Sequence, residues 1–187
     1  MACIFDYILL IDKEATCWNT VPPFGMESEI IEIGICPVDL KTLEIGEPRS
    51  IIVKPERSTV SKFCTDLTGI TQGMVDKGIP LKEAFDILRY EYQSRKRIWA
   101  SWGNYDRKLT ERLCITHRLP YPYGPSHINF KSLFSVMHQL DEELGMSNAL
   151  EFLNMPLKGQ HHRGVDDAYN IARLWIETFK RKENEDR

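Results

Sequence analysis

Acidic side chains at positions where the chain should be buried are the first chemical signal in this sequence. Asp12 and Glu14 stand two residues apart at the end of an apolar segment, residues 4–11, which has the length of a strand. Side chains two apart on a strand point to the same face, so these two carboxylates converge. Taken alone, the pair fits equally well a strand that runs out into a solvated loop.

Asp106 begins the apolar stripe of a predicted helix over residues 104–117. Leu109 and Leu113 follow it three and seven residues later, on the same helical face. An acid in the first helical turn is also stabilised by the helix dipole, which taken alone is the simpler explanation. The dipole does not explain why this acid shares the buried face.

The segment 161–167 contains two histidines and two aspartates in two overlapping His-x-x-x-x-Asp registers. Asp167 precedes apolar residues by four and seven positions, so helical phase places it on the apolar side of a predicted helix over 166–182. Asp166 lies about one hundred degrees round that helix and suits a cap or solvent. We therefore pair Asp167 with His162, which must reach the site from the preceding loop. Considered alone, a histidine there is more simply an exposed loop residue.

The three acidic positions gain meaning together, because each lies where a strand ends or a helix begins. Ligands of α/β sheets bind in the crevice at the strand ends. Carboxylates gathered there would repel one another at neutral pH unless cations lie between them, and all-oxygen ligation favours Mg²⁺ or Mn²⁺. Two such ions about 4 Å apart can hold the attacking and leaving oxygens of a phosphoryl displacement. A neutral histidine can accept the proton of the attacking water, so the implied chemistry is phosphodiester hydrolysis.

The elements that must position these residues follow from hydrophobic periodicity and turn signals. Strands are predicted over residues 4–11, 29–38, 43–53, 97–102 and 127–130. Helices are predicted over residues 61–67, 71–77, 80–92, 104–117, 131–139, 147–153 and 166–182. A three-strand meander followed by alternating strands and helices indicates an α/β fold, with a mixed five-stranded sheet and helices on both faces.

Length and composition limit the class of protein. The 187 residues favour one domain, predicted over 1–182 with a polar tail over 183–187. The net charge of −3 argues against a protein that coats nucleic acid, though not against an enzyme that grips one end of a strand. Five cysteines without a Cys-x-x-Cys pair argue against a disulfide scaffold or zinc knuckle. With no spanning segment or signal peptide visible, we expect a cytoplasmic protein without a membrane partner.

The acidic blocks together resemble the DEDD superfamily of 3′→5′ exonucleases, in its histidine-containing (DEDDh) subfamily with an RNase H-like fold. The matching stretches are IDKEAT, WGNYD and HHRGVDDAYNIARL, in the family's order and across nearly the whole chain. Two further stretches, EIIEIG and KFCTDLTGIT, look like the branch that contains the histone-mRNA and small-RNA 3′ exonucleases and their bacterial relatives related to sporulation inhibitors.

This resemblance implies a role for each matched residue. Asp12, Glu14 and Asp167 would hold the first of two Mg²⁺ or Mn²⁺ ions, Asp12 would bridge to the second, and Asp106 would support the second through water. His162 would be the general base.

The resemblance also implies substrate contacts near the 3′ end. Ala15 and Thr16 would pass beside the terminal sugar, while Phe63 and Tyr105 would stack on or flank the terminal base. Leu67 is a weaker candidate for the same pocket. Simple core packing is the alternative explanation for Phe63.

Lys13 departs from the family pattern, in which the residue between the two acids is usually apolar. By strand alternation its side chain points away from Asp12 and Glu14. We expect it either to reach solvent at the strand end or to mark a locally looser sheet.

The resemblance implies a metal-dependent 3′→5′ exoribonuclease that acts on single-stranded or overhanging 3′ ends and releases nucleoside 5′-monophosphates. Its partners would be nucleic acid 3′ ends, with RNA preferred over DNA.

A DNA exonuclease of the proofreading type shares the same acids, and the choice depends on contacts to the 2′-hydroxyl that no single residue here reveals. A catalytically silent nucleic-acid-binding module is the third alternative, although such a module would not need all four acids and the histidine. Protein partners and oligomeric state are not indicated.

Overall fold

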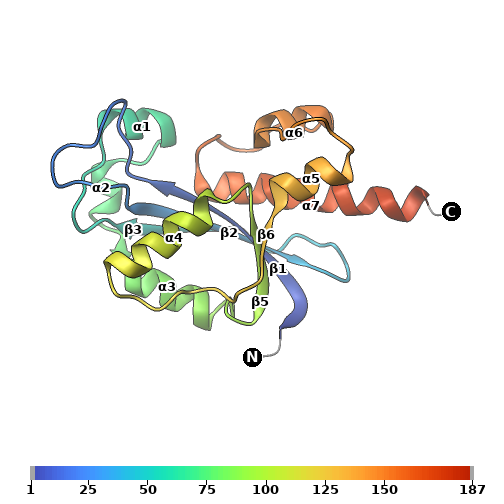
Figure 1. The fold of residues 1–187 in the computed structure, drawn as a ribbon, viewed down its shortest axis with the longest axis horizontal. Helices are drawn as coiled ribbons and strands as arrows, with labels where there is room; N and C mark the ends of the chain where they lie inside the picture. Colours follow the sequence, from blue (N-terminus) through green and yellow to red (C-terminus); the bar gives the residue numbers. More distant parts are fainter. Residues whose placement is uncertain (1–2, 186–187) are drawn as a thin grey trace.

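The fold is organised around a mixed sheet of six strands in the order β4-β3-β2-β1-β5-β6. Figure 1 labels all of these strands except the short β4. The computed structural model describes residues 3–185 of the chain. Strand pairing is antiparallel for β1–β2 and β2–β3 and parallel for β1–β5, β5–β6 and β3–β4. The strands are β1 (Ile4–Ala15), β2 (Ile30–Asp39), β3 (Arg49–Lys54), β4 (Ile79–Pro80), β5 (Arg97–Ser101) and β6 (His127–Asn129).

Helices cover both faces of the sheet, as the sequence predicts. They are α1 (Lys62–Thr68), α2 (Gln72–Val75), α3 (Leu81–Tyr90), α4 (Tyr105–Thr116), α5 (Phe130–Met137), α6 (Met146–Phe152) and α7 (Gly164–Glu185). Within residues 3–185, no helix combines the length and apolarity that crossing a membrane requires.

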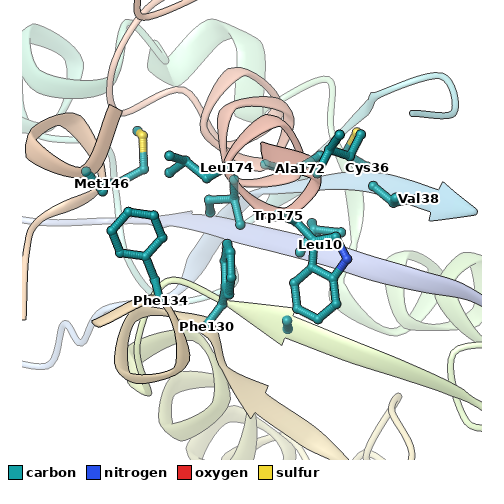
Figure 2. Close-up of a cluster of buried hydrophobic side chains, with 14 of the residues drawn as sticks. Leu10, Cys36, Val38, Phe130, Phe134, Met146, Ala172, Leu174 and Trp175 are labelled. Atoms are coloured by element: carbon teal, nitrogen blue, oxygen red, sulfur yellow. The ribbon is translucent and has the colours of Figure 1, made fainter. Parts of the chain in front are cut away.

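The central strand β1 contributes side chains to two separate hydrophobic cores, because its side chains alternate between the faces of the sheet. Leu10 joins the cluster under α5, α6 and α7, where Phe130 and Trp175 lie (Figure 2). Leu9 packs on the opposite face, in the cluster beneath α3 and α4 that includes Trp99. Burying side chains on both faces makes β1 a rigid base for the acids at its far end.

The expected α/β fold is confirmed, but the sheet has six strands rather than five. The additional strand β4 has two residues, which pair in parallel with the end of β3 (Val53 with Ile79). So short a strand shows no periodicity and leads directly into α3, so it could not be separated from the predicted helix. The strand predicted over 43–53 begins only at Arg49, and Ile45 before it makes just an isolated bridge to Val38.

Two element ends differ from the predictions in ways that concern the acids. β1 continues to Ala15, because Asp12 and Glu14 still pair with Gly34 and Glu32 of β2. The two carboxylates therefore sit on the paired strand itself and not in a loop after it. At the other terminus, α7 continues to Glu185, into the predicted tail, and residues 186–187 lie outside the described residues.

A close backbone approach brings α7 onto the sheet beside those acids. A Cβ atom added at Gly34 of β2 would lie 1.9 Å from the carbonyl oxygen of Gly164, the first residue of α7. Only glycine permits this contact, which fixes the start of α7 against β2.

Candidate active site

The end of β1 and the starts of α4 and α7 bring the four predicted acids into one pocket of about 270 Å³. Asp12 and Glu14 come from β1, Asp106 from the first turn of α4, and Asp167 from the first turn of α7. The other residues that line the pocket are Lys13, Trp102, Tyr105, Met146, His161 and His162. Segments far apart in the sequence thus converge where the sheet strands end.

Asp12, Glu14 and Asp167 form the tightest acidic cluster, each offering an oxygen within 4.8 Å of the others. Burial and the repulsion of neighbouring carboxylates raise the pKa of Glu14 to about 8 and the pKa of Asp12 well above its usual range. Burial also raises the pKa of Asp167, although a hydrogen bond with His161 opposes the rise. Such mutual repulsion is what a bound cation relieves, and the all-oxygen donor set fits Mg²⁺ or Mn²⁺.

Asp106 is not part of this 4.8 Å cluster, and it is almost fully buried at 4% exposure. Burial raises the pKa of its carboxyl group, while the positive charge of Lys13 lowers it. Hydrogen bonding from the Lys13 backbone and the Ser101 hydroxyl lowers this pKa as well. Asp106 therefore has nearby groups that stabilise its ionised form in the absence of a metal.

The expectation that Lys13 reaches solvent or loosens the sheet is wrong. Lys13 is 4% exposed, it pairs in register with Ile33 of β2, and its ammonium lies over the rings of Trp99 and Tyr123. Helix α4 and the segment after it cover the end of β1 on that face, so the ammonium is shielded from solvent. Burial lowers the pKa of Lys13 to about 8.

The loop that carries His161 and His162 is held at the pocket by hydrogen bonds to Asp167. His162 has a left-handed backbone (φ 64°), and its amide nitrogen donates to an Asp167 carboxylate oxygen at 2.9 Å. The Nδ1 atom of His161 lies 3.1 Å from the same oxygen, and the two imidazole rings stack with centroids 4.0 Å apart. Burial and the neighbouring His161 lower the pKa of His162, which favours the neutral ring. His161 therefore lies at the pocket together with the predicted pair His162 and Asp167.

Two buried polar residues that the sequence analysis did not single out hold this loop in place. The carboxylate of Glu32 accepts hydrogen bonds from the Gly164 amide at 2.8 Å and from Arg163 at 3.2 Å. The side chain of Asn170 bridges α7 to both backbone groups of Lys158. The sequence could have indicated Glu32, because this charged residue interrupts the apolar part of EIIEIG within a buried strand. No comparable sequence feature marks Asn170.

Of the five predicted substrate-binding residues, only Tyr105 lines the pocket. Phe63 is exposed on α1 and Leu67 is half-buried there, both outside the pocket lining. Ala15 is part of the hydrophobic core. The buried Thr16 hydroxyl accepts from the Glu29 amide at 2.9 Å and donates to the Glu27 carbonyl, so it is engaged within the protein.

Trp102 and Met146 form an apolar wall of the pocket that the sequence analysis missed. Trp102 follows β5, and its indole nitrogen donates to the Leu144 carbonyl at 3.0 Å, which fixes the ring. Met146 begins α6. Neither residue belongs to a pattern that distinguishes pocket lining from core packing, so only the folded chain reveals them.

Comparison with known families decides what kind of site this is. Residues 9–175 match the RNase_T family, described as exonuclease. The chain belongs to this exonuclease family. It is 34% identical to human 3′-5′ exoribonuclease 1 over 182 residues, which are 92% of this chain and 52% of that protein. It is 29% identical to the 3′-5′ exonuclease Snipper of Drosophila melanogaster, covering 91% of this chain and 68% of that protein. The chain therefore spans about half the length of the human relative.

Solved structures agree with this family membership. The nuclease domain of 3′hExo, a DEDDh family member bound to rAMP, matches with a TM-score of 0.84 and 32% identity, covering 96% of this exonuclease chain and 94% of that domain. A 3′-exonuclease described in 3′-end-specific recognition of the histone mRNA stem-loop matches with a TM-score of 0.82 and 32% identity, over 94% and 82% of the two chains. The resemblance to DEDDh exonucleases is confirmed.

Proposed function

We propose that this chain is a metal-dependent 3′→5′ exoribonuclease that releases nucleoside 5′-monophosphates from single-stranded or overhanging 3′ ends. The observation that carries the proposal is the convergence of Asp12, Glu14, Asp106 and Asp167 with His162 in one pocket. The names of the relatives support RNA as the substrate, because human exoribonuclease 1 and the histone mRNA stem-loop nuclease both act at RNA 3′ ends by their descriptions.

The acidic residues would hold two Mg²⁺ or Mn²⁺ ions. Asp12, Glu14 and Asp167 form one ligand set, whose oxygens already lie within 4.8 Å of one another. Asp12 and Asp106 would share the second ion. When bound, the pair of ions supplies positive charge at the scissile phosphate and at the leaving 3′ oxygen.

His162 is the proposed general base. Its pKa is lowered, so the ring is neutral near pH 7 and can accept the proton of the attacking water. The hydrogen bond from its own amide to Asp167 fixes the loop that carries the ring. His161 is the second candidate, because its Nδ1 atom also lies at the pocket, where it contacts Asp167.

Tyr105 is the proposed stacking platform for the terminal base. It lines the pocket and is 58% exposed, so part of its surface is accessible to a ligand. Stacking on an aromatic ring is tolerant of sequence, which suits an enzyme that removes successive nucleotides. The contacts of Phe63 and Leu67 to the terminal base, and of Ala15 and Thr16 to the terminal sugar, stay predictions, because these residues lie outside the pocket lining.

Digestion of 5′-labelled single-stranded RNA and a matched DNA, with Mg²⁺ or Mn²⁺, tests the proposal. We expect an RNA ladder that disappears with chelator and with Asp167→Asn. Asp166→Asn is the matched control, because its carboxylate accepts a hydrogen bond from the Gln160 amide and does not line the pocket.

Each alternative has its own outcome in this experiment. Faster digestion of DNA than of RNA would favour the proofreading type of exonuclease. Binding of Mn²⁺ and RNA without any ladder would identify a silent binding module.

A further inference from the structure

Lys13 carries a buried charge that hydrogen bonding does not satisfy. Among the residues that the structure describes, its ammonium nitrogen has no hydrogen-bond partner. It lies 5.1 Å and 4.9 Å from the ring centroids of Trp99 and Tyr123, which stack on each other at 4.1 Å. Ring faces attract a cation, but they replace only part of the hydration that burial removes. The charge must therefore be balanced by other charged groups.

Those groups are acids of the active site. Asp106 lies in the first turn of α4, the helix that packs with Trp99 and Tyr123 on the face of β1 where Lys13 is buried, and Lys13, Asp12 and Asp106 line the same pocket. The charges of Asp106 and Asp12 oppose the lowering of the Lys13 pKa by burial, and Lys13 in turn lowers the pKa of Asp106. The other acids have different partners, since Arg163 acts on Glu14 and His161 on Asp167. Lys13 therefore belongs specifically to the Asp106 side of the pocket.

We propose that Lys13 is a positioning residue whose buried positive charge balances Asp106 and Asp12, and so weakens binding of the second divalent ion until a substrate phosphate is present. This inference rests on the proposed function, because it concerns the ion that those two carboxylates would share. Four carboxylates, two divalent ions and one phosphodiester together leave one uncompensated negative charge. The ammonium of Lys13 neutralises it, so the assembled site is electrically balanced only with the substrate phosphate in place.

The protein without RNA should therefore show two unequal affinities for Mn²⁺. Strand alternation turns the Lys13 side chain away from Glu14, so an ion held by Glu14 and Asp167 should bind more tightly. The ion at Asp106 should be repelled by the buried charge, because charges interact strongly where water is excluded.

Calorimetric titration of Mn²⁺ into the full-length chain without RNA tests this inference. Lys13→Met removes the charge and keeps an apolar side chain of similar length between the two rings. Lys82→Met is the matched control, because it removes one exposed positive charge from α3, outside the pocket. Circular dichroism and thermal melting verify that each variant is folded.

We expect Lys13→Met to tighten the weaker Mn²⁺ site by about tenfold or more, with a smaller change at the tighter site and none in Lys82→Met. Equal weaker-site affinities in Lys13→Met and Lys82→Met, or weaker binding in Lys13→Met, would overturn the role of Lys13. If the wild-type chain binds no Mn²⁺ at all, the proposed function itself fails. The two failures are thus distinguishable.

Discussion

The two sides of the carboxylate pocket solve the same electrostatic problem differently. On one side, Glu14 and Asp167 lie with Asp12 in a cluster of mutually repelling oxygens, and the pKa of Glu14 stays raised to about 8 although Arg163 acts to lower it. On the other side, Asp106 has the buried ammonium of Lys13 as a built-in counter-charge. The difference predicts that carboxylate ligands of the same chemistry bind divalent ions unequally, because residues behind the ligands set the local charge.

Replacing one acid on each side of the pocket should affect RNA digestion and Mn²⁺ binding differently. Asp167→Asn should lower the rate of RNA digestion by about 10³-fold or more and abolish the tighter Mn²⁺ site. Asp106→Asn should also lower the rate, by about 10²-fold or more, yet leave the tighter site intact. Rate measurements with calorimetry on both variants check this. Loss of the tighter site in Asp106→Asn alone would reverse the assignment of the two sides.

The two stacked histidines on the Glu14–Asp167 side should differ sharply in their effect on the rate. His162→Ala should lower the rate by about 10²- to 10⁴-fold, the range typical of a general base. His161→Ala should cost less than about tenfold, because that ring acts on Asp167 and only indirectly on the attacking water. Single-turnover kinetics on both variants provide the comparison. A larger loss in His161→Ala would make His161 the base.

Metal removal should make the folding stability of the chain depend on pH through the same cluster. The pKa of Glu14 is raised from 4.5 to about 8, so between these values the native state binds more protons than the unfolded state. Below about pH 6.5 the lowered pKa of His127, about 4, acts in the opposite direction. The free energy of unfolding should therefore fall mainly as pH rises from about 6.5 to 8, by on the order of 1–2 kcal/mol.

Urea denaturation in chelator at several pH values measures this change. The raised pKa values of Asp12 and Asp167 act in the same direction. Added Mn²⁺ should remove most of the decline, because the ions neutralise the carboxylates and bind only the folded chain. A stability that rises in chelator between about pH 6.5 and 8 would contradict the account of this cluster.

The smallest predicted effect concerns the residue that supports the histidine loop. Glu32→Gln replaces one of the carboxylate oxygens that receive the Gly164 amide and Arg163, and should cost about 1–3 kcal/mol of stability. Glu83→Gln, at an exposed position of α3, is the control and should change stability by less than about 0.5 kcal/mol. Urea denaturation of both variants tests the prediction, which equal stabilities would refute.

The residues that the sequence could predict are those that violate a pattern. Asp106 and Asp167 stand on apolar helical stripes, and Asp12 and Glu14 follow an apolar strand, so periodicity marked them as unusual. Their positions at a strand end and at helix starts then predicted that they meet in one crevice. The same reasoning predicted every helix of the structure and all strands except β4. Hydrophobic periodicity and the acids that interrupt it are local features, so one sequence is enough to detect them.

The residues that the sequence could not predict depend on packing between distant segments. Alternation correctly turned Lys13 away from the two acids, but only the fold shows that α4 and the rings of Trp99 and Tyr123 enclose it. Likewise, Thr16 is an ordinary loop residue in the sequence, and its burial depends on the backbone of Glu27 and Glu29. No local pattern encodes contacts of this kind.

The identity of the reaction product tests the central claim most directly, namely that the carboxylate pocket directs water at the terminal phosphodiester. Single-stranded RNA is digested in ¹⁸O-labelled water with Mn²⁺, and the products are analysed by mass spectrometry. The account predicts nucleoside 5′-monophosphates that carry one ¹⁸O atom on phosphorus. Products ending in 2′,3′-cyclic phosphates or 3′-phosphates would show attack by the ribose hydroxyl or cleavage of the other ester bond, and would contradict it.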